Sequence, residues 1–402
     1  MSIELSIVMP CLNEAETLER CIKKAQSFLG RSNARGEIIV GDNGSVDGSK
    51  EIARRCGARV IDVPIRGYGA AIWGACMSAQ GTYCVMGDSD DSYDFSSLDS
   101  FLAELRAGAD LVMGNRFLGG IAPGAMPWKN RCIGNPVLSG IGRFLFGAPT
   151  NDFHCGLRAF SRDAFLRMDL RTTGMEFASE MVIKATLMKM KIVEVPTTLS
   201  QDGRSRPPHL RPYRDGWRHL RFMLLFSPNW LFLYPGLFLM ALGLTAAAVL
   251  LATPVHFGSV HFNVDTLIYC VTLVEIGFQA TLFALLSRAY AIQEGLFPKP
   301  PRPSVFETLF TLERGVLAGG VLLLFGAFLF GDALNIWRNA QFGPLDFEHI
   351  ARLVIGSSLS MSLGFEVVLS TFLLSIFKLN VRTLSSEQRA SLDLDTRLET
   401  AA

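Results

Sequence analysis

The chain has 402 residues, of which 49% are hydrophobic, and its formal net charge at pH 7 is +1. It is too long for one small domain, and a charge this near zero gives no global field that would favour nucleic acid or an acidic partner. The eight cysteines form no CxxC pair, which argues against a zinc site or a thioredoxin-type motif. We expect mostly buried, reduced thiols in a cytosolic compartment.

The first part of the chain, to about residue 225, alternates short apolar runs with helix-like stretches. The opening "MSIELSIVMP" lacks a basic region, so we interpret it as a strand and not as a signal peptide. The runs are "LSIVMP", "EIIVGDN", "ARVIDVP", "TYCVMGD" and "ADLVMGN", and helix-like stretches include "EAETLERCIKKAQSFL" and "VDGSKEIARRCG". This alternation predicts a mostly parallel sheet with helices on both faces. Ligands bind beyond the carboxyl ends of such strands, so "CLNE", "DNGS" and "GDSDD" should converge on one crevice.

Four aspartates crowd the end of the fourth apolar run: Asp88, Asp90, Asp91 and Asp94. Asp88 and Asp90 could share a hard divalent cation, which would remove their repulsion. Mg²⁺ is usually held by one or two carboxylates together with substrate phosphates, so the pattern indicates a ligand that carries a diphosphate. A helix-loop-helix calcium loop is excluded, because Ser92 and Tyr93 occupy positions that need an acid or Asn and then Gly. Alternatively, the aspartates only cap a turn or the next helix.

Residues 209–228 join the two halves of the chain and carry arginines at helical spacing: Arg211, Arg214, Arg218 and Arg221. The adjacent side of such a helix would hold Tyr213, Trp217, Leu220 and Leu224. This pattern predicts a basic amphipathic helix in the headgroup layer of a membrane. A general bias toward positive charge on the cytoplasmic side is the simpler explanation for any single arginine.

Four long apolar runs follow, at residues 231–252, 266–287, 315–331 and 353–377. Each approaches the ~20 residues of a membrane-spanning helix, so we predict a four-helix transmembrane domain over 229–380 and a cytoplasmic tail over 381–402. The distribution of loop arginines and lysines predicts a multi-pass protein of the inner membrane with the first domain in the cytoplasm. Glu275 and Glu366 lie inside runs and either act in function or pair with a neighbour. Glycines at 315, 319, 320 and 326 suit close helix packing, and a homo-oligomer through these helices is possible.

Several segments together resemble the family 2 glycosyltransferases of GT-A fold: "SIVMPCLNEAETL", "IIVGDNGSVDGS", "VMGDSDD", "GNRF", "WKNR", "NDFHCGLRAF" and "RDGWRHLRF". The resemblance covers roughly residues 3–225. It is strongest to the polyprenyl-phosphate glycosyltransferases, which include the dolichol-phosphate mannose and glucose synthases. The implied architecture is an α/β, Rossmann-like GT-A domain over 1–208, then the interfacial helix and the all-α membrane domain.

The resemblance also implies roles for individual residues. The donor nucleotide would be bound by Pro10, Asn13, Glu14, Asp42, Asp88 and Asp90. The metal, Mg²⁺ or Mn²⁺, would be held by Asp88 and Asp90. The acceptor phosphate would be bound by Arg116, Arg131, Asn135, Arg204 and Arg206. The segment under the sugar would contain Asp152, Gly156 and Arg158. The catalytic set would be Asp90, Asp152, Arg116 and Arg131.

The chain departs from the family pattern at two places. The metal loop reads D-S-D-D-S where the common form is D-A-D-L-Q, so a Gln ligand is missing and Ser92 takes its place. Asn135 stands where Ser is expected. These departures concern the third metal ligand and one acceptor contact.

The implied reaction is the inverting, metal-dependent transfer of a hexose from a nucleotide sugar to a polyprenyl phosphate at the cytoplasmic membrane face. UDP-glucose is the favoured donor and GDP-mannose is next. The acceptor oxygen is already anionic, so the reaction needs alignment more than a strong base. We accordingly interpret His154 as a local hydrogen-bonding residue. Glu176 and Glu180 would share a helix face, which either positions the sugar or faces solvent.

Two alternatives remain open from the sequence. The chain could glycosylate another lipid or a saccharide, although it has no Q-x-x-R-W motif of the kind seen in processive polysaccharide synthases and ceramide-type glucosyltransferases. It could also be a non-enzymatic, nucleotide-sensing membrane transporter. Four spans without internal repeats are few for a transporter.

Overall fold

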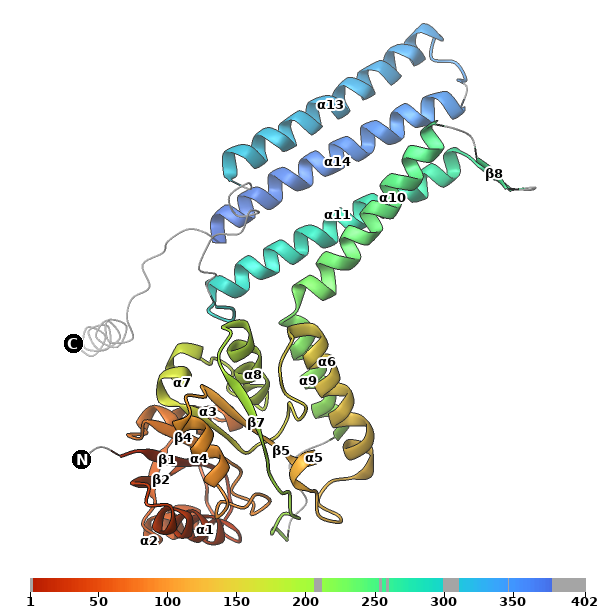
Figure 1. Ribbon diagram of the computed structural model, residues 1–402. Helices are drawn as coiled ribbons and strands as arrows, with labels where there is room; N and C mark the ends of the chain where they lie inside the picture. Colours follow the sequence, from red (N-terminus) through yellow and green to blue (C-terminus); the bar gives the residue numbers. More distant parts are fainter. Residues whose placement is uncertain are drawn as a thin grey trace, which may run out of the picture. The chain divides into compact units, whose positions relative to one another are not determined.

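The computed structural model describes residues 3–205, 212–252, 255–257, 260–298, 311–345 and 347–377. These residues form two compact units (Figure 1). The first runs to Pro235 and includes the segment that begins at Glu294, and the second contains Gly236–Gln293 and the last two long helices. The predictions for Arg206, Arg211 and the 381–402 tail lie outside the described residues.

A sheet of seven strands in the order β3-β2-β1-β4-β6-β5-β7 forms the centre of the first unit. The strands are β1 (Leu5–Cys11), β2 (Gly36–Asp42), β3 (Arg59–Asp62), β4 (Tyr83–Met86), β5 (Leu111–Asn115), β6 (Arg158–Ser161) and β7 (Ile192–Pro196). All neighbouring strands are parallel except β6, which runs antiparallel to β4 and β5. The predicted mostly parallel sheet is confirmed, and the five predicted strands are β1 to β5. The sequence analysis did not anticipate β6 and β7.

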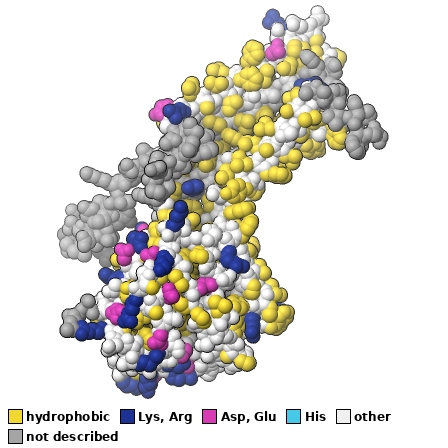
Figure 2. Space-filling model, in the orientation of Figure 1, with side chains coloured by type: hydrophobic (Ala, Val, Ile, Leu, Met, Phe, Trp, Pro, Cys, Tyr) yellow, Lys and Arg dark blue, Asp and Glu magenta, His cyan; other side chains and the backbone are white. Residues whose placement is uncertain are grey.

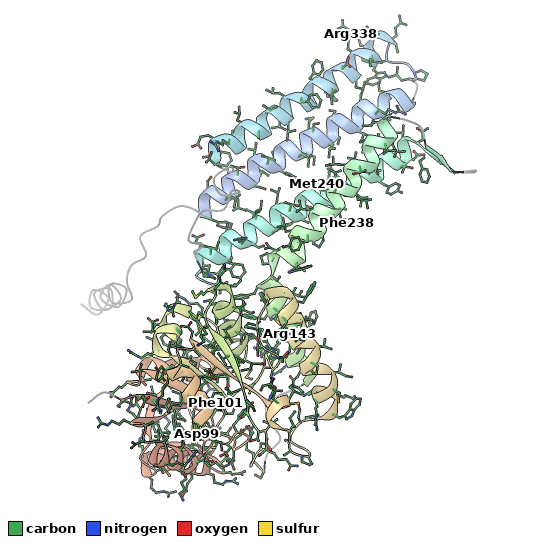
Figure 3. All side chains as sticks on the ribbon, in the orientation of Figure 1. Asp99, Phe101, Arg143, Phe238, Met240 and Arg338 are labelled. Atoms are coloured by element: carbon green, nitrogen blue, oxygen red, sulfur yellow. The ribbon has the colours of Figure 1, made fainter. Side chains whose placement is uncertain are left out.

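Helices cover both faces of this sheet (Figure 1). They are α1 (Leu18–Arg31), α2 (Ser49–Arg55), α3 (Tyr68–Ser78), α4 (Asp99–Arg106), α5 (Arg116–Gly119), η1 (Asn130–Gly134), α6 (Asn135–Phe146), α7 (Arg162–Met168), α8 (Phe177–Leu187) and α9 (Pro212–Leu225). Strand periodicity divides the core, because Ile7 and Met9 join the cluster under α1 and α4, whereas Val8 joins the cluster under α3 and α8. On α4, Phe101 is buried and Asp99 is exposed (Figure 3).

Helix α9 belongs to the first unit. Phe222, Met223 and Phe226, at its end and just after it, are buried in the cluster under α3 and α8. Trp217, which was expected on the apolar side, is 60% exposed. Trp217 thus lies on the side expected to contact the headgroup layer of a membrane, and the interfacial position of the helix stays a prediction.

Four helices are long and apolar enough to cross a membrane: Asn229–Leu251, Val264–Gln293, Leu312–Asn339 and Ile350–Phe377. They correspond to η2 (Asn229–Leu233) with α10 (Tyr234–Ala252), then α11 (Val264–Gln293), α13 (Leu312–Asn339) and α14 (Phe347–Phe377). The short strands β8 (Val255–Phe257) and β9 (Val260–Phe262) connect α10 to α11. Hydrophobic side chains coat these helices, whereas charged side chains gather over the α/β unit (Figure 2). The prediction of four spans is confirmed.

Glycines bring α13 and α14 into close contact, as predicted. Gly315, Gly319 and Gly326 are buried on α13, and a β-carbon at Gly319 would lie 2.7 Å from the carbonyl oxygen of Gly364 on α14. Gly320 instead faces open space. These contacts are made within one chain, and the homo-oligomer stays a prediction. Glu275 on α11 and Glu366 on α14 lie on helices that pack together, and their role also stays a prediction.

Candidate active site

A cleft of about 350 Å³ opens where β1, β2 and β4 end, within the size range of small-molecule sites. Its lining is Pro10, Cys11, Leu12, Glu14, Asn43, Arg66, Gly67, Tyr68, Ala71, Asp88, Ser89, Asp90, Met175, Arg204, Arg214 and Arg218. "CLNE", "DNGS" and "GDSDD" each contribute residues, so the three segments converge as predicted. The parallel sheet causes this, because it places the carboxyl ends of these strands at one edge.

The four clustered aspartates have different surroundings. Asp88 and Asp90 line the cleft. Asp91 faces α1, where Lys24 Nζ lies 2.8 Å from its Oδ1. Asp94 accepts hydrogen bonds from the backbone N–H of Ser96, at 3.0 Å, and from its hydroxyl, at 2.6 Å. The turn interpretation therefore holds for Asp94, and Asp90 accepts a matching hydrogen bond from the backbone N–H of Ser92 at 3.1 Å. Asp88 and Asp90 differ from the other two acids in that they line the cleft.

Asp88 occupies an environment that disfavours its negative charge. Burial, and next the charge of Asp90, raise the pKa of Asp88 to about 6, whereas a hydrogen bond donated by the Tyr68 hydroxyl at 2.9 Å lowers it. A β-carbon at Gly156 would lie 2.6 Å from Asp88 Oδ2, so only glycine leaves this oxygen room. A cation at this point would relieve the repulsion between the two carboxylates.

Arg204 already places a positive charge among these acids. Its guanidinium contacts Glu14 Oε1 at 3.1 Å and Asp90 Oδ2 at 2.5 Å, and its side chain is 12% exposed. Within the part of the chain that is described, no group of three or more His, Cys, Asp or Glu could hold a metal. Two carboxylates with oxygen donors nevertheless fit Mg²⁺ or Mn²⁺, because substrate phosphates and water commonly complete such sites. Ser92 Oγ donates a hydrogen bond to Asp90 Oδ1 at 2.6 Å and so helps to orient the Asp90 carboxylate.

Two residues expected to bind the donor form hydrogen bonds with the backbone of a loop beside the cleft. Asn13 has a φ of 59° and accepts a hydrogen bond from the Val46 N–H at 2.8 Å. Asp42 is 1% exposed and accepts a hydrogen bond from the Gly44 N–H at 2.9 Å. Neither residue lines the cleft. Asn43 does, and sequence reasoning missed it although it adjoins Asp42 in "DNGS".

Asn43 fixes the loop that leads into α3. Its side-chain amide donates to the carbonyl oxygen of Ile65 at 2.7 Å, and its Oδ1 accepts from the Gly67 N–H at 2.6 Å. Gly67 has a φ of 137°, which an L side chain rarely adopts. This loop brings Arg66 and Tyr68 to the cleft. Their neighbourhood in the sequence carries no charge pattern that would have revealed them.

Arg116 and Asp152 pair with each other in the structure. The guanidinium of Arg116 donates to both carboxylate oxygens of Asp152, at 2.7 and 2.6 Å, and the two residues are 8% and 0% exposed. Arg116 does not line the cleft in this arrangement, and the phosphate contact expected for it stays a prediction. Burial of both charges makes each depend on the other.

The remaining predicted residues of this region also lie away from the cleft lining. Arg131 is exposed on η1, and the Asn135 side-chain nitrogen lies 3.2 Å from Met126 Sδ. Arg158 is fully buried and donates to the carbonyl oxygens of Cys155 and Phe153, at 2.8 and 3.0 Å. Arg158 thus holds the loop before β6 that carries Gly156.

His154 is not placed as a catalytic base. Its ring packs against Phe153 and His219, with centroid distances of 5.3 and 4.6 Å. Burial, and next the charge of His219, lower the pKa of His154 well below its usual value. Among the described residues neither of its ring nitrogens has a hydrogen-bond partner, so the expected local hydrogen bonds are not formed.

Glu176 and Glu180 do not share an exposed helix face. Glu176 Oε1 accepts two hydrogen bonds from Arg218, at 3.0 and 2.7 Å. Glu180 is 0% exposed and forms an ion pair with Lys184 at 2.9 Å. Both predicted roles for Glu180, sugar contact and solvated face, are wrong, because the pair lies inside the domain.

Comparison with known proteins identifies the family. Residues 6–168 match the description "Glycosyl transferase family 2", and residues 285–378 match "Glycosyltransferase family 2 C-terminal transmembrane region". A low-salt glycan biosynthesis hexosyltransferase of Haloferax volcanii is 38% identical over 375 residues, which cover 92% of this chain and 88% of the relative.

Shorter relatives match the α/β part. A dolichyl-phosphate hexose transferase of Haloferax volcanii is 32% identical over 215 residues, covering 53% of this chain and 89% of the relative. A polyprenol monophosphomannose synthase of Mycolicibacterium smegmatis is 27% identical over 210 residues, covering 48% and 77%. Among solved structures, glucosyl-3-phosphoglycerate synthase of Mycobacterium tuberculosis, in complex with Mn²⁺, UDP-glucose and phosphoglyceric acid, is 25% identical with a TM-score of 0.45, covering 56% and 79%.

Both parts of the chain therefore match parts of one family. The α/β fold, the acid-lined cleft at the strand ends and the four apolar helices agree with these matches. The chain belongs to glycosyltransferase family 2 and is a membrane protein that carries the transmembrane region of this family after its catalytic domain.

Proposed function

We propose that this glycosyltransferase transfers a hexose from a nucleotide sugar to a polyprenyl phosphate, with inversion at the anomeric carbon. UDP-glucose is the favoured donor and GDP-mannose is next. The observation that carries the proposal is the cleft, in which Asp88 and Asp90 face four arginines in a chain with four membrane-spanning helices. The names of two relatives, a dolichyl-phosphate hexose transferase and a polyprenol monophosphomannose synthase, support the same acceptor class.

The donor diphosphate would lie against the acidic end of the cleft. Asp88 and Asp90 would hold Mg²⁺ or Mn²⁺, which when bound neutralises the charge that grows on the departing nucleoside diphosphate. Arg204, which was expected to bind the acceptor phosphate, lies 2.5 Å from Asp90 and would instead contact the donor phosphates. Pro10 and Glu14, from the end of β1 and the loop after it, would line the nucleoside side of the cleft.

The acceptor needs positioning and not deprotonation, because a phosphate monoester is anionic at neutral pH. His154 agrees with this, since its lowered pKa keeps it neutral and it does not line the cleft. Alignment of the phosphate oxygen behind the anomeric carbon would supply most of the rate enhancement. Family membership favours an enzyme over the nucleotide-sensing transporter.

The placement in the cell is part of the proposal. The loop charges favour a multi-pass protein of the inner membrane, with the catalytic domain and both termini in the cytoplasm. Cysteine accessibility at the β8–β9 connection and in the α/β unit would report the two sides.

A transfer assay tests the proposed reaction. Membranes that contain the protein are incubated with polyprenyl phosphate, Mg²⁺ and a panel of labelled nucleotide sugars. The test variant is Asp90→Asn and the matched control is Asp99→Asn, an exposed acid on α4 (Figure 3). We expect label in a chloroform-soluble, mild-acid-labile product, which is lost in the first variant and kept in the second.

Other outcomes separate the parts of the proposal. Hydrolysis of one nucleotide sugar without a lipid product would support the proposed donor class and contradict the proposed polyprenyl-phosphate acceptor. If the lipid product forms equally well in the presence of EDTA and with the Asp90→Asn variant, the reaction does not depend on a metal held by Asp90. A product that resists mild acid would indicate a glycosidic bond to another lipid.

A further inference from the structure

Of the described arginines expected to bind the acceptor phosphate, Arg204 lines the cleft and two do not. Arg116 is held by Asp152, and Arg131 lies outside the cleft lining. The arginines that line the cleft are Arg66, Arg204, Arg214 and Arg218. Arg204 contacts Glu14 and Asp90 at the acidic end. The other three arginines come from α9 and from the loop before α3.

Helix α9 carries two of these arginines, and its end is packed into the core of the α/β unit. Arg214 and Arg218 are four residues apart, so they project from neighbouring turns of one helix face. Phe222 and Met223 anchor the next turn in the core. Glu176 accepts two hydrogen bonds from Arg218, at 3.0 and 2.7 Å, and these fix the orientation of its guanidinium.

Arg66 reaches the cleft from a second element. The backbone of its loop is tied to Asn43, which accepts from the Gly67 N–H at 2.6 Å and donates to the Ile65 carbonyl oxygen at 2.7 Å. A guanidinium presents planar, permanently charged donors that match phosphate oxygens. Arginines from two separate elements that line one cleft form a binding site for an anion.

We propose that Arg66, Arg214 and Arg218 form a second anion subsite of this cleft, which binds the phosphate monoester of the lipid acceptor. The inference rests on the proposed function and assigns its acceptor site. The acids and Arg204 already account for the donor diphosphate, and two phosphate groups that must approach each other need separate cations. Along the chain, Arg218 lies only eleven residues before Asn229, the start of the first span.

The test compares arginines on one helix. Arg214→Gln and Arg218→Gln change the proposed subsite, and Arg221→Gln is the matched control, because Arg221 is exposed on α9 and does not line the cleft. Arg66→Gln is a second test that leaves the Glu176 contact intact. The full chain is purified in detergent and assayed with geranyl phosphate, a short polyprenyl monophosphate, and UDP affinity is measured by calorimetry with Mn²⁺.

We expect the KM for geranyl phosphate to rise roughly tenfold or more in Arg214→Gln, Arg218→Gln and Arg66→Gln, because charge-assisted contacts to phosphate are lost. The affinity for UDP with Mn²⁺ should stay the same in all variants, and Arg221→Gln should match the unmodified chain. Apparent Tm values of the variants show whether each one is folded.

Two results would overturn the inference. If UDP affinity falls and the KM for geranyl phosphate does not change, these arginines serve the donor. If neither quantity changes, they do not bind substrate. If the unmodified chain makes no lipid product, the proposed function fails separately, and calorimetric binding of geranyl phosphate against inorganic phosphate still decides whether the subsite exists. Loss of geranyl phosphate binding in the three test variants would support the subsite, whereas unchanged binding in these variants would contradict it.

Discussion

At the scale of single residues, the ability of the candidate site to bind a ligand depends on how its acidic and basic side chains pair with one another. Asp90 faces Arg204, and Arg116 faces Asp152, although both arginines were expected to bind phosphate. Arg204 is partly exposed and lies among cleft acids, so a ligand can take its place or recruit it. Arg116 is buried in a closed pair, so its removal would leave a buried unpaired carboxylate. The same residue type thus has a ligand-facing role in one position and a structural role in the other.

The Arg204 contact predicts an effect on metal affinity. In Arg204→Gln, the affinity of the nucleotide-free protein for Mn²⁺ should rise roughly tenfold, because a charge-assisted contact worth about 1.5 kcal/mol no longer competes for Asp90. Electron paramagnetic resonance of free Mn²⁺ measures this affinity directly. Arg31→Gln is the control, since Arg31 pairs with exposed Asp99 at 2.7 Å. A weaker affinity in Arg204→Gln would show that Arg204 supports the metal site and does not compete with it.

At the scale of elements, the helices show how far a pattern identifies the face that packs. The transmembrane helices agree with the sequence, because length and apolar composition decide whether a helix can cross a bilayer. Helix α9 was expected to lie in the headgroup layer of a membrane with Trp217 on its apolar side, and its pattern did not predict that Phe222 and Met223 would be buried. A helix with apolar residues on more than one side has several possible packing faces, and the neighbouring elements select among them.

The α13–α14 contact predicts different effects for two adjacent glycines. Gly319→Ala should lower the apparent Tm of the purified protein in detergent, because its β-carbon would lie 2.6 Å from Val368 Cγ2 and 2.7 Å from the Gly364 oxygen. Overpacking of this kind costs about 1–3 kcal/mol. Gly320→Ala is the control, since nothing lies within 4 Å of the corresponding position. Equal Tm values for the two variants would contradict the close packing.

At the scale of the whole molecule, the first unit also includes a segment that follows α11 in the chain. Residues 294–298 follow a membrane-spanning helix, yet they belong to the α/β unit. Lys184 Nζ donates to the Gly295 carbonyl oxygen at 2.9 Å, and the ring of Phe297 lies 5.4 Å from that of Phe226. The buried Glu180–Lys184 pair thus holds a loop that the sequence alone would assign to the membrane domain.

This contact predicts a loss of order in that loop when Lys184 is removed. Lys184→Met should lower the free energy of unfolding of the α/β unit by about 3–5 kcal/mol, because Glu180 is left buried without its cation. Hydrogen exchange should become faster in residues 294–298. Lys23→Met is the matched control, since the Glu19–Lys23 pair has the same i,i+4 spacing but is 38% and 67% exposed, and water and salt screen such surface pairs. Unchanged exchange in the loop would refute the anchoring role.

The sequence by itself determined the parts of this protein that depend on local patterns. Strands β1 to β5, the four spans and the family motifs follow from apolar runs, their length and the turn residues that end them. The convergence of three segments on one cleft follows from the rule for parallel sheets. The strands β6 and β7 escaped notice although they are no shorter than β3 and β4. Glu194 interrupts the apolar run of β7, and β6 begins with Arg158, a charge that is buried only in the complete fold.

Only the tertiary structure decided which charged residues meet. Arg204 and Asp90 are 114 residues apart in the chain, and Arg116 and Asp152 are 36 apart. No periodicity links positions at such separations, and every arginine looks alike in sequence whether a carboxylate already holds it or it opens into a cleft. Burial and pairing of a charge are set by the packing of the complete fold, so the arginines that line a cleft can be identified only after the chain has folded.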